Sequence, residues 1–225
     1  MKNFKQLFGK TIIFLSFCFN THAFVSDIKV AETGAEIRDI FHELMEDKVN
    51  FDPKKILTFF DCDDVLHKNE DSVLQKTHIS NFLKKMELGE EQLAIAFEEI
   101  FQKSPKELVD IEILNLVNEL QENKVPAFSL TQCTSKNSTR NRRISTLNKL
   151  GYNFKASLPV TESISFDVGA LKLRFLQTEL TKPVYDRGVI FAGSAEKGNT
   201  LKAFLDWLYT LKTEISPLKN MTIVF

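Results

Sequence analysis

Three classes of protein are disfavoured by what this sequence has little of. Its 225 residues carry a formal net charge of −1 and therefore lack the basic surplus that a nucleic-acid binder needs. Its three cysteines are too few for a disulfide-dense scaffold, and no apolar run reaches the roughly 20 residues of a transmembrane helix. What remains is an ordinary globular composition, 43% hydrophobic, sufficient for one core and a small appended subdomain.

The first residues resemble an export signal more than fold material. Three lysines within ten residues precede the short apolar stretch "TIIFLSFCF", 11–19, and the small residues Thr21 and Ala23 follow. This pattern predicts a cleaved signal peptide over 1–23 and a periplasmic or secreted mature chain. A buried N-terminal strand is the alternative interpretation of the same stretch.

The rest of the chain alternates between short apolar runs and helical periodicity. Strands are expected at 56–60, 126–131, 188–193 and 221–225. Helices are expected over 34–47, over much of the fifty residues after Asp64, over the dozen residues that end at Gly151, and after a capping Ser194. Continuous apolar strands between helices predict an α/β fold with a parallel sheet covered on both faces, and its ligand sites lie at the carboxyl ends of the strands. Residues 155–187 are less regular and suggest a β-hairpin insertion outside the core.

A cluster of carboxylates follows the first of these strands. In "ILTFFDCDDVL", Asp61, Asp63 and Asp64 come directly after five apolar or β-branched residues. Two carboxylates about 4 Å apart repel by about 1 to 4 kcal/mol, which a fold tolerates when a cation lies between them or one is protonated. Mg²⁺ is the natural cation for such oxygen ligands. The alternative is an acidic turn in which one aspartate caps the next helix.

These residues resemble the motifs of the haloacid dehalogenase (HAD) superfamily. "ILTFFDCDDVL" is similar to its first motif, "AFSLT" with Thr131 to its second, and "GVIFAGSAEKGNTLKAFL" with Lys197 to its third. The resemblance implies a Rossmannoid three-layer sandwich with a parallel sheet, spanning 24–225. It also implies a small helical cap inserted at about 67–122, which favours a small phosphorylated molecule as substrate.

The resemblance also implies a role for each residue. Asp61 would attack phosphorus and form an aspartyl-phosphate, and Asp63 would protonate the leaving oxygen and then activate water. Mg²⁺ would be held by Asp61 and the backbone carbonyl of Asp63. Thr131 would bind the transferring phosphoryl group and Lys197 would neutralise its charge. Taken alone, a threonine at a strand end such as Thr131 is usually a turn residue, and a lysine in a first helical turn such as Lys197 is usually solvated.

The fourth HAD motif, an acidic pair after a last apolar strand, is absent. "NMTIVF" resembles that strand and the sequence stops at Phe225. We therefore expect a sheet that is incomplete at the C-terminus, with an apolar edge, and an impaired Mg²⁺-dependent phosphohydrolase. The alternative is a non-catalytic binding or interaction protein that keeps the HAD scaffold.

Several other polar residues receive an ordinary structural interpretation. The basic cluster Arg140, Arg142 and Arg143 is expected on the solvated face of a helix. His67 and His78 are interpreted as surface or packing residues. Cys62 and Cys133 are interpreted as packing residues, although their expected positions at neighbouring strand ends make a disulfide conceivable.

Overall fold

The computed structural model describes residues 11–19, 22–46, 52–71, 81–82, 85–86, 89–158, 160–173, 177, 179–211 and 222–224. For 11–30, 222–224 and part of α3 it describes the backbone alone. His78, the lysines before residue 11 and both ends of the 221–225 run lie outside the described residues. Among the described residues, no helix is both long enough and apolar enough to cross a bilayer.

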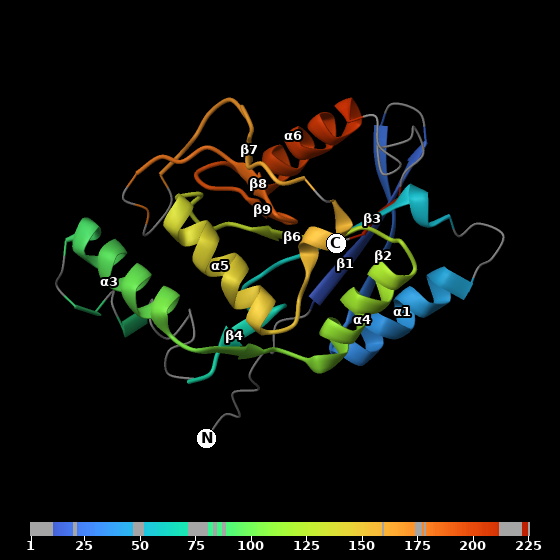
Figure 1. Cartoon of the computed structure of the whole chain (residues 1–225), viewed down its shortest axis with the longest axis horizontal. Coiled ribbons are helices and arrows are strands. Elements are labelled where there is room, and N and C mark those ends of the chain that lie inside the picture. The colour runs from blue at the N-terminus through green and yellow to red at the C-terminus, as the bar shows by residue number, and fades with distance from the viewer. Residues whose placement is uncertain are drawn as a thin grey trace, which may run out of the picture.

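One mixed sheet organises the chain (Figure 1). Its strand order is β2-β1-β10-β3-β6-β9-β8-β7. The four central strands run parallel and the outer strands antiparallel. The strands are β1 (Thr11–Phe19), β2 (His22–Ala31), β3 (Ile56–Phe60), β6 (Ala127–Thr131), β7 (Ile164–Ser165), β8 (Val184–Asp186), β9 (Val189–Phe191) and β10 (Thr222–Val224).

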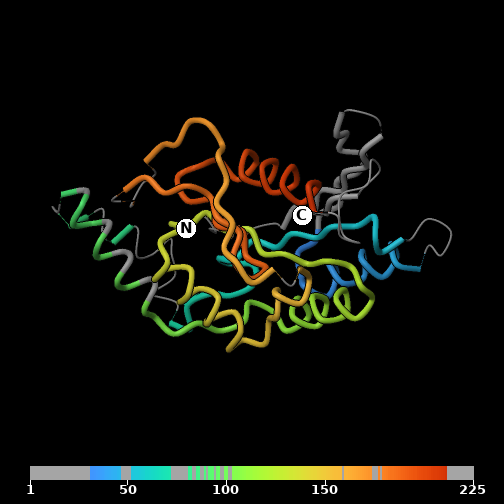
Figure 2. The backbone as a smooth tube through the Cα atoms, turned by 45° about the horizontal axis from the view of Figure 1, so that its top comes forward, coloured from blue at the N-terminus to red at the C-terminus, as the bar shows by residue number. Residues whose placement is uncertain are grey.

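Helices cover both faces of this sheet, so the predicted α/β class and its parallel centre are confirmed. The helices are α1 (Gly34–Glu46), α3 (Glu90–Lys103), α4 (Ile111–Glu122), α5 (Asn137–Lys149) and α6 (Lys197–Thr210). Two short 3-10 helices are η1 (Pro53–Lys55) and η3 (Phe154–Ser157). Helix α6 lies on the face opposite α4 and α5 (Figure 2).

The continuous apolar character of β3 follows from burial on both faces. All five of its residues are buried; Ile56 and Phe60 pack in the core on the α1, α4 and α5 side, whereas Leu57 and Phe59 pack on the α6 side. The one polar member, Thr58, donates its hydroxyl to the Pro126 carbonyl at 2.9 Å. A strand buried in this way fixes the position of the residues that follow it.

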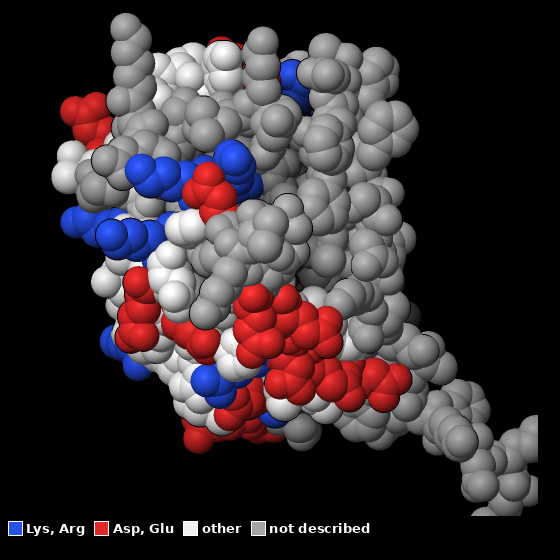
Figure 3. Space-filling view, turned by 90° about the vertical axis from the view of Figure 1, so that its right-hand side faces the viewer, with Lys and Arg blue, Asp and Glu red and all other residues white. Residues whose placement is uncertain are grey.

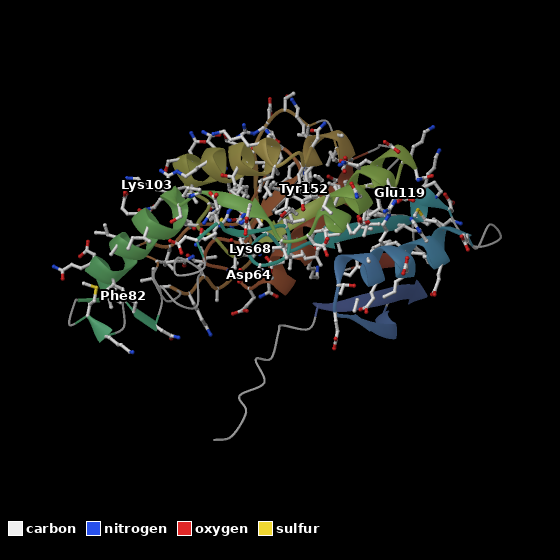
Figure 4. All side chains as sticks on the ribbon, turned by 90° about the horizontal axis from the view of Figure 1, so that it is seen from below. Asp64, Lys68, Phe82, Lys103, Glu119 and Tyr152 are labelled. Atoms are coloured by element: carbon white, nitrogen blue, oxygen red, sulfur yellow. The ribbon has the colours of Figure 1, made fainter. Side chains whose placement is uncertain are left out.

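Residues 67–122 do not form the single helical insertion that was expected as a cap. Strand β4 (His67–Asn69) pairs antiparallel with β5 (Lys106–Leu108), and α3 lies between them in the chain. Helix α4 instead packs in the main core through buried apolar residues, so it belongs to the layer that covers the sheet. The three-residue strands β4 and β5 are too short to leave a period in the sequence. In Figure 4, Phe82 lies at the outer end of this projecting segment, while Asp64 and Lys68 lie near the molecule's centre.

Three further expectations are corrected. Strand β10 pairs with β1 as well as β3, so it is not an edge strand in the full chain. The hairpin expected at 155–187 is not outside the core: its last part is β8, and Tyr185 is fully buried in the sheet. Ser194 does not cap α6, whose first turn follows Glu196; its hydroxyl binds Gln177 and the Thr181 amide.

Helix α1 contributes an acidic surface. Its exposed acids recur at helical spacing, and acidic side chains gather on the side of the molecule that Figure 3 shows. The row consists of Glu36, Asp39, Glu43 and Glu46. On its inner side, Arg38 donates to Glu112 at 2.7 Å and Glu119 at 3.2 Å, which joins α1 to α4.

Candidate active site

The carboxyl ends of β3, β6 and β9 meet at one edge of the sheet, as the parallel pairing requires. Asp61 follows β3 directly, Thr131 ends β6, and the loop after β9 leads into Lys197 at the start of α6. The four residues singled out in the sequence therefore come from neighbouring elements. Their individual contacts differ.

Asp61 and Lys197 form a direct ion pair. Lys197 Nζ lies 2.6 Å from Asp61 Oδ2, and the side chains are 33% and 44% exposed. Asp61 Oδ1 also accepts the Cys62 amide at 2.8 Å. A half-exposed pair contributes at most about 1 kcal/mol of stability, so an incoming anion can replace the carboxylate beside Lys197 at small cost. The first turn of α6 also favours negative charge.

The loop before Lys197 is held by a residue that sequence reasoning missed. Gln132, directly after β6, donates its amide to the carbonyls of Gly193 at 3.0 Å and Ala195 at 2.8 Å. These bonds tie the end of β6 to the segment that leads into α6 and so position Lys197. A polar residue directly after a buried strand was the available signal.

Asp63 pairs with a different cation from the Lys197 that pairs with Asp61. Its Oδ1 accepts from Arg143 Nη1 at 2.7 Å, and the side chains are 14% and 4% exposed. Arg143 was expected on a solvated face, so that interpretation is wrong for this residue. Arg140 is also largely buried and lies 3.6 Å from the buried Asp186 carboxylate. Helix α5 therefore carries two inward-facing arginines, and each meets a buried carboxylate.

His67 completes a buried polar cluster with Asp63 and Arg143. Its Nε2 lies 2.6 Å from Arg143 Nη1 and 3.9 Å from Asp63 Oδ1. Burial, followed by the Arg143 charge, lowers the pKa of His67 to about 3, so the ring is neutral at pH 7. Because arginine only donates, Nε2 must accept and Nδ1 carries the proton. Nδ1 is buried with no hydrogen-bond partner in the described part of the chain.

Thr131 is buried, and its hydroxyl interacts with the Cys133 thiol but makes no hydrogen bond of ordinary geometry within the described residues. A bound oxyanion would supply a stronger acceptor for this hydroxyl. Its backbone carbonyl accepts the Ala192 amide at 2.8 Å, which ties β6 to the end of β9.

The two cysteines near the site are free. Cys62 is fully buried, with its sulfur 2.8 Å from the Ser129 hydroxyl oxygen, and burial raises its pKa to about 12. Burial also raises the pKa of Cys133. Both are therefore neutral thiols, in agreement with the packing interpretation.

Asp64 has a backbone role. Its φ of +62° lies in the left-handed region, which aspartate tolerates better than most residues. Its amide donates to the His67 carbonyl at 2.9 Å, and the His67 amide donates to Cys62 at 3.2 Å. These bonds close the tight loop that follows Asp61 and hold His67 close to Asp63.

The residues present fit a Mg²⁺ ion that keeps most of its water. Asp61 offers an exposed carboxylate at the carboxyl edge of the sheet. No three acidic, histidine or cysteine residues gather as a metal cluster among those described. Mg²⁺ is commonly held by one or two carboxylates with water and substrate phosphate, which this set allows.

No curated protein and no solved structure matches this chain. Residues 35–215 match the family model described as "Protein of unknown function (DUF2608)". This match spans Asp61, Asp63, Thr131, Arg143 and Lys197. Because it covers well over half of the sequence, the chain belongs to the DUF2608 family.

Proposed function

We propose that the chain is an exported, HAD-type, Mg²⁺-dependent phosphohydrolase that acts on a small phosphomonoester through an aspartyl-phosphate. The observation that carries the proposal is the pairing of Asp61 with Lys197 at 2.6 Å at the carboxyl edge of the sheet. A nucleophilic carboxylate there lies beside a cation and a helix N-terminus, both of which favour a bound phosphoryl group.

In this proposal the chain's residues divide the reaction between them. Lys197 exchanges Asp61 for a phosphoryl oxygen, and Asp61 is then released to attack phosphorus. The Thr131 hydroxyl donates to another phosphoryl oxygen. Mg²⁺, held by Asp61 and the Asp63 carbonyl, would supply the charge that lets a carboxylate approach a phosphate.

Asp63 serves the two halves of this reaction unequally. Arg143 favours its carboxylate form, which suits the activation of water by Asp63. The same pairing opposes protonation of a leaving oxygen by Asp63. We therefore expect aryl phosphates, whose leaving groups need little protonation, to react faster than alkyl phosphates.

A second candidate, a non-catalytic binding or interaction protein on the same scaffold, is favoured by one observation. Asp61 and Asp63 are each already paired with a cation, Lys197 and Arg143 respectively. Such an arrangement needs no metal to offset the repulsion between the carboxylates, and it suits anion binding without turnover.

The deciding experiment is hydrolysis of p-nitrophenyl phosphate with Mg²⁺ and with EDTA. The full chain should hydrolyse it only with Mg²⁺, and Asp61→Asn should abolish turnover because the amide is not a nucleophile. Glu70→Gln, at a nearby exposed acid, is the matched control and should retain activity. Absence of Mg²⁺-dependent turnover in folded wild-type protein would establish the non-catalytic alternative.

Export is tested separately, by the intact mass of protein expressed in a bacterial host. We expect a mature chain that begins near residue 24. Such cleavage would remove β1 and leave the outer side of β10 without that neighbour. Recovery of residues 1–23 in every fraction would contradict export through a signal peptide.

A further inference from the structure

A pocket lined by four cations lies between the end of α3 and one face of α5. Its volume is about 400 Å³, within the range of small-molecule sites. Lys103, Lys106, Arg142 and Lys149 line it together with the hydroxyl residues Ser104 and Thr146. No acidic side chain is among the described residues that line the pocket.

Two separate parts of the chain build this pocket. Ser104 ends α3, and Lys106 begins β5, where its amine donates to the Asn69 side-chain oxygen. Helix α5 contributes Arg142, Thr146 and Lys149, which are spaced four and three residues apart and so share one helix face. Arg143, which directly follows Arg142 in the chain, instead points inward and pairs with Asp63. Adjacent arginines of α5 therefore serve different environments, with the pocket on one side and the Asp63 cluster on the other.

Ordinary helix chemistry accounts for only part of this charge. Lys103 and Lys149 stand in the last turns of α3 and α5, where cations are favoured by the helix dipole, and Lys103 also pairs with Glu99. Arg142 lies in the middle of α5 and Lys106 on a strand, so the dipole explains neither. In the described part of the chain, Arg142 and Lys149 have no ion pair.

The remaining cation is held at a cost. Burial, with the Arg143 charge second, lowers the pKa of Lys106 to about 8. A bound anion would offset this desolvation and the effect of the Arg143 charge on Lys106. Arginine and lysine beside hydroxyl groups match the oxygen-rich surface of a phosphate.

We propose that this pocket binds a small anion of the phosphate or polyphosphate class, at a site separate from the one at Asp61. The ligand must be small because the cations are confined to one pocket. The chain as a whole is slightly acidic, which disfavours a long polyanion. The phosphoryl group belongs either to free polyphosphate or to a small organic phosphate. This binding does not depend on the proposed hydrolysis.

The test is calorimetric titration of the full chain with inorganic pyrophosphate, in EDTA and low salt at pH 7, with a sugar phosphate as the second ligand. We expect pyrophosphate to bind the wild type and to bind Arg142→Gln and Lys149→Gln at least about tenfold more weakly, since charge-assisted hydrogen bonds are lost. Lys155→Gln, an exposed lysine outside the pocket, is the matched control. The sugar phosphate distinguishes a free ligand from an esterified one.

Lys197→Gln separates this pocket from the site at Asp61: any pyrophosphate bound beside Lys197 should be lost, whereas the binding that Arg142→Gln and Lys149→Gln weaken should remain. The proposal would be overturned if Lys197→Gln bound pyrophosphate more weakly while Arg142→Gln and Lys149→Gln bound it as tightly as the wild type. A flat titration of the wild type would also overturn it. Circular dichroism of each variant checks that the fold is intact. Pyrophosphate binding without phosphatase activity would leave this inference standing while the proposed hydrolysis fails.

Discussion

The buried pair between Arg143 and Asp63 gives the sharpest prediction about stability. Arg143 is 4% exposed and Asp63 14% exposed, with 2.7 Å between Nη1 and Oδ1. Removal of one partner of such a pair leaves an uncompensated charge and costs about 3–5 kcal/mol. This is a large part of the 5–15 kcal/mol that is typical of a whole domain. We therefore expect Arg143→Met to be severely destabilised.

A double-mutant cycle in urea at pH 7 isolates the pair. Asp63→Asn alone should also destabilise, because Arg143 then keeps its charge without the carboxylate. The double variant removes both charges and should be more stable than Arg143→Met by at least about 2 kcal/mol. Arg142→Met is the matched control and should lie within about 0.5 kcal/mol of the wild type, since its side chain is on the outer face. An Arg143→Met variant within about 1 kcal/mol of the wild type, or an additive cycle, would refute the reasoning.

Three further predictions follow from burial and backbone geometry. His67 is protonated near pH 6.5 in the unfolded chain but only near pH 3 in the folded chain, so the free energy of unfolding should fall by about 1.4 kcal/mol per pH unit as the pH drops through this window. His67→Asn should remove this contribution. Parallel pH profiles of unfolding free energy for the two proteins would contradict the prediction. Iodoacetamide followed by peptide mass spectrometry should label the buried Cys62 only after unfolding, whereas rapid labelling of Cys62 in the native protein would show that this thiol is accessible. Gly188→Ala should lower the free energy of unfolding by roughly 2–4 kcal/mol in a denaturant titration, because φ is +84° and a Cβ would lie 2.2 Å from the Phe154 backbone. A decrease below about 0.5 kcal/mol would show that the turn between β8 and β9 relaxes freely.

The sheet's centre was predictable because its signals are local. A strand buried on both faces is mostly apolar on both of its sides, which marked β3, β6 and β9 in the sequence. Parallel strands place their carboxyl ends at one edge, which predicted that Asp61, Asp63 and Thr131 would lie there, and the resemblance to the HAD motifs added Lys197 to this group. In the structure Lys197 Nζ lies 2.6 Å from Asp61 Oδ2. The three-residue strands β4 and β5 carried no period and were missed.

The partners of the polar residues were not predictable in the same way. Arg143 and Arg142 are adjacent and chemically identical, and composition alone assigned both to a solvated helix face. Which of them is buried depends on the rotation of α5 against the sheet, and this is set by Ile144 and Leu147 packing in the core. That packing turns Arg143 toward Asp63 and Arg142 toward the pocket beside Lys106.

The sequence by itself therefore determined the α/β class, the central strands and the edge of the sheet at which Asp61 and Thr131 lie. It did so because burial and periodicity are properties of consecutive residues. Only the tertiary structure decided that Asp63 pairs with Arg143, that α4 belongs to the core, and that four cations share one pocket. These pairings join residues up to 80 positions apart, and their geometry depends on how the helices pack on the sheet.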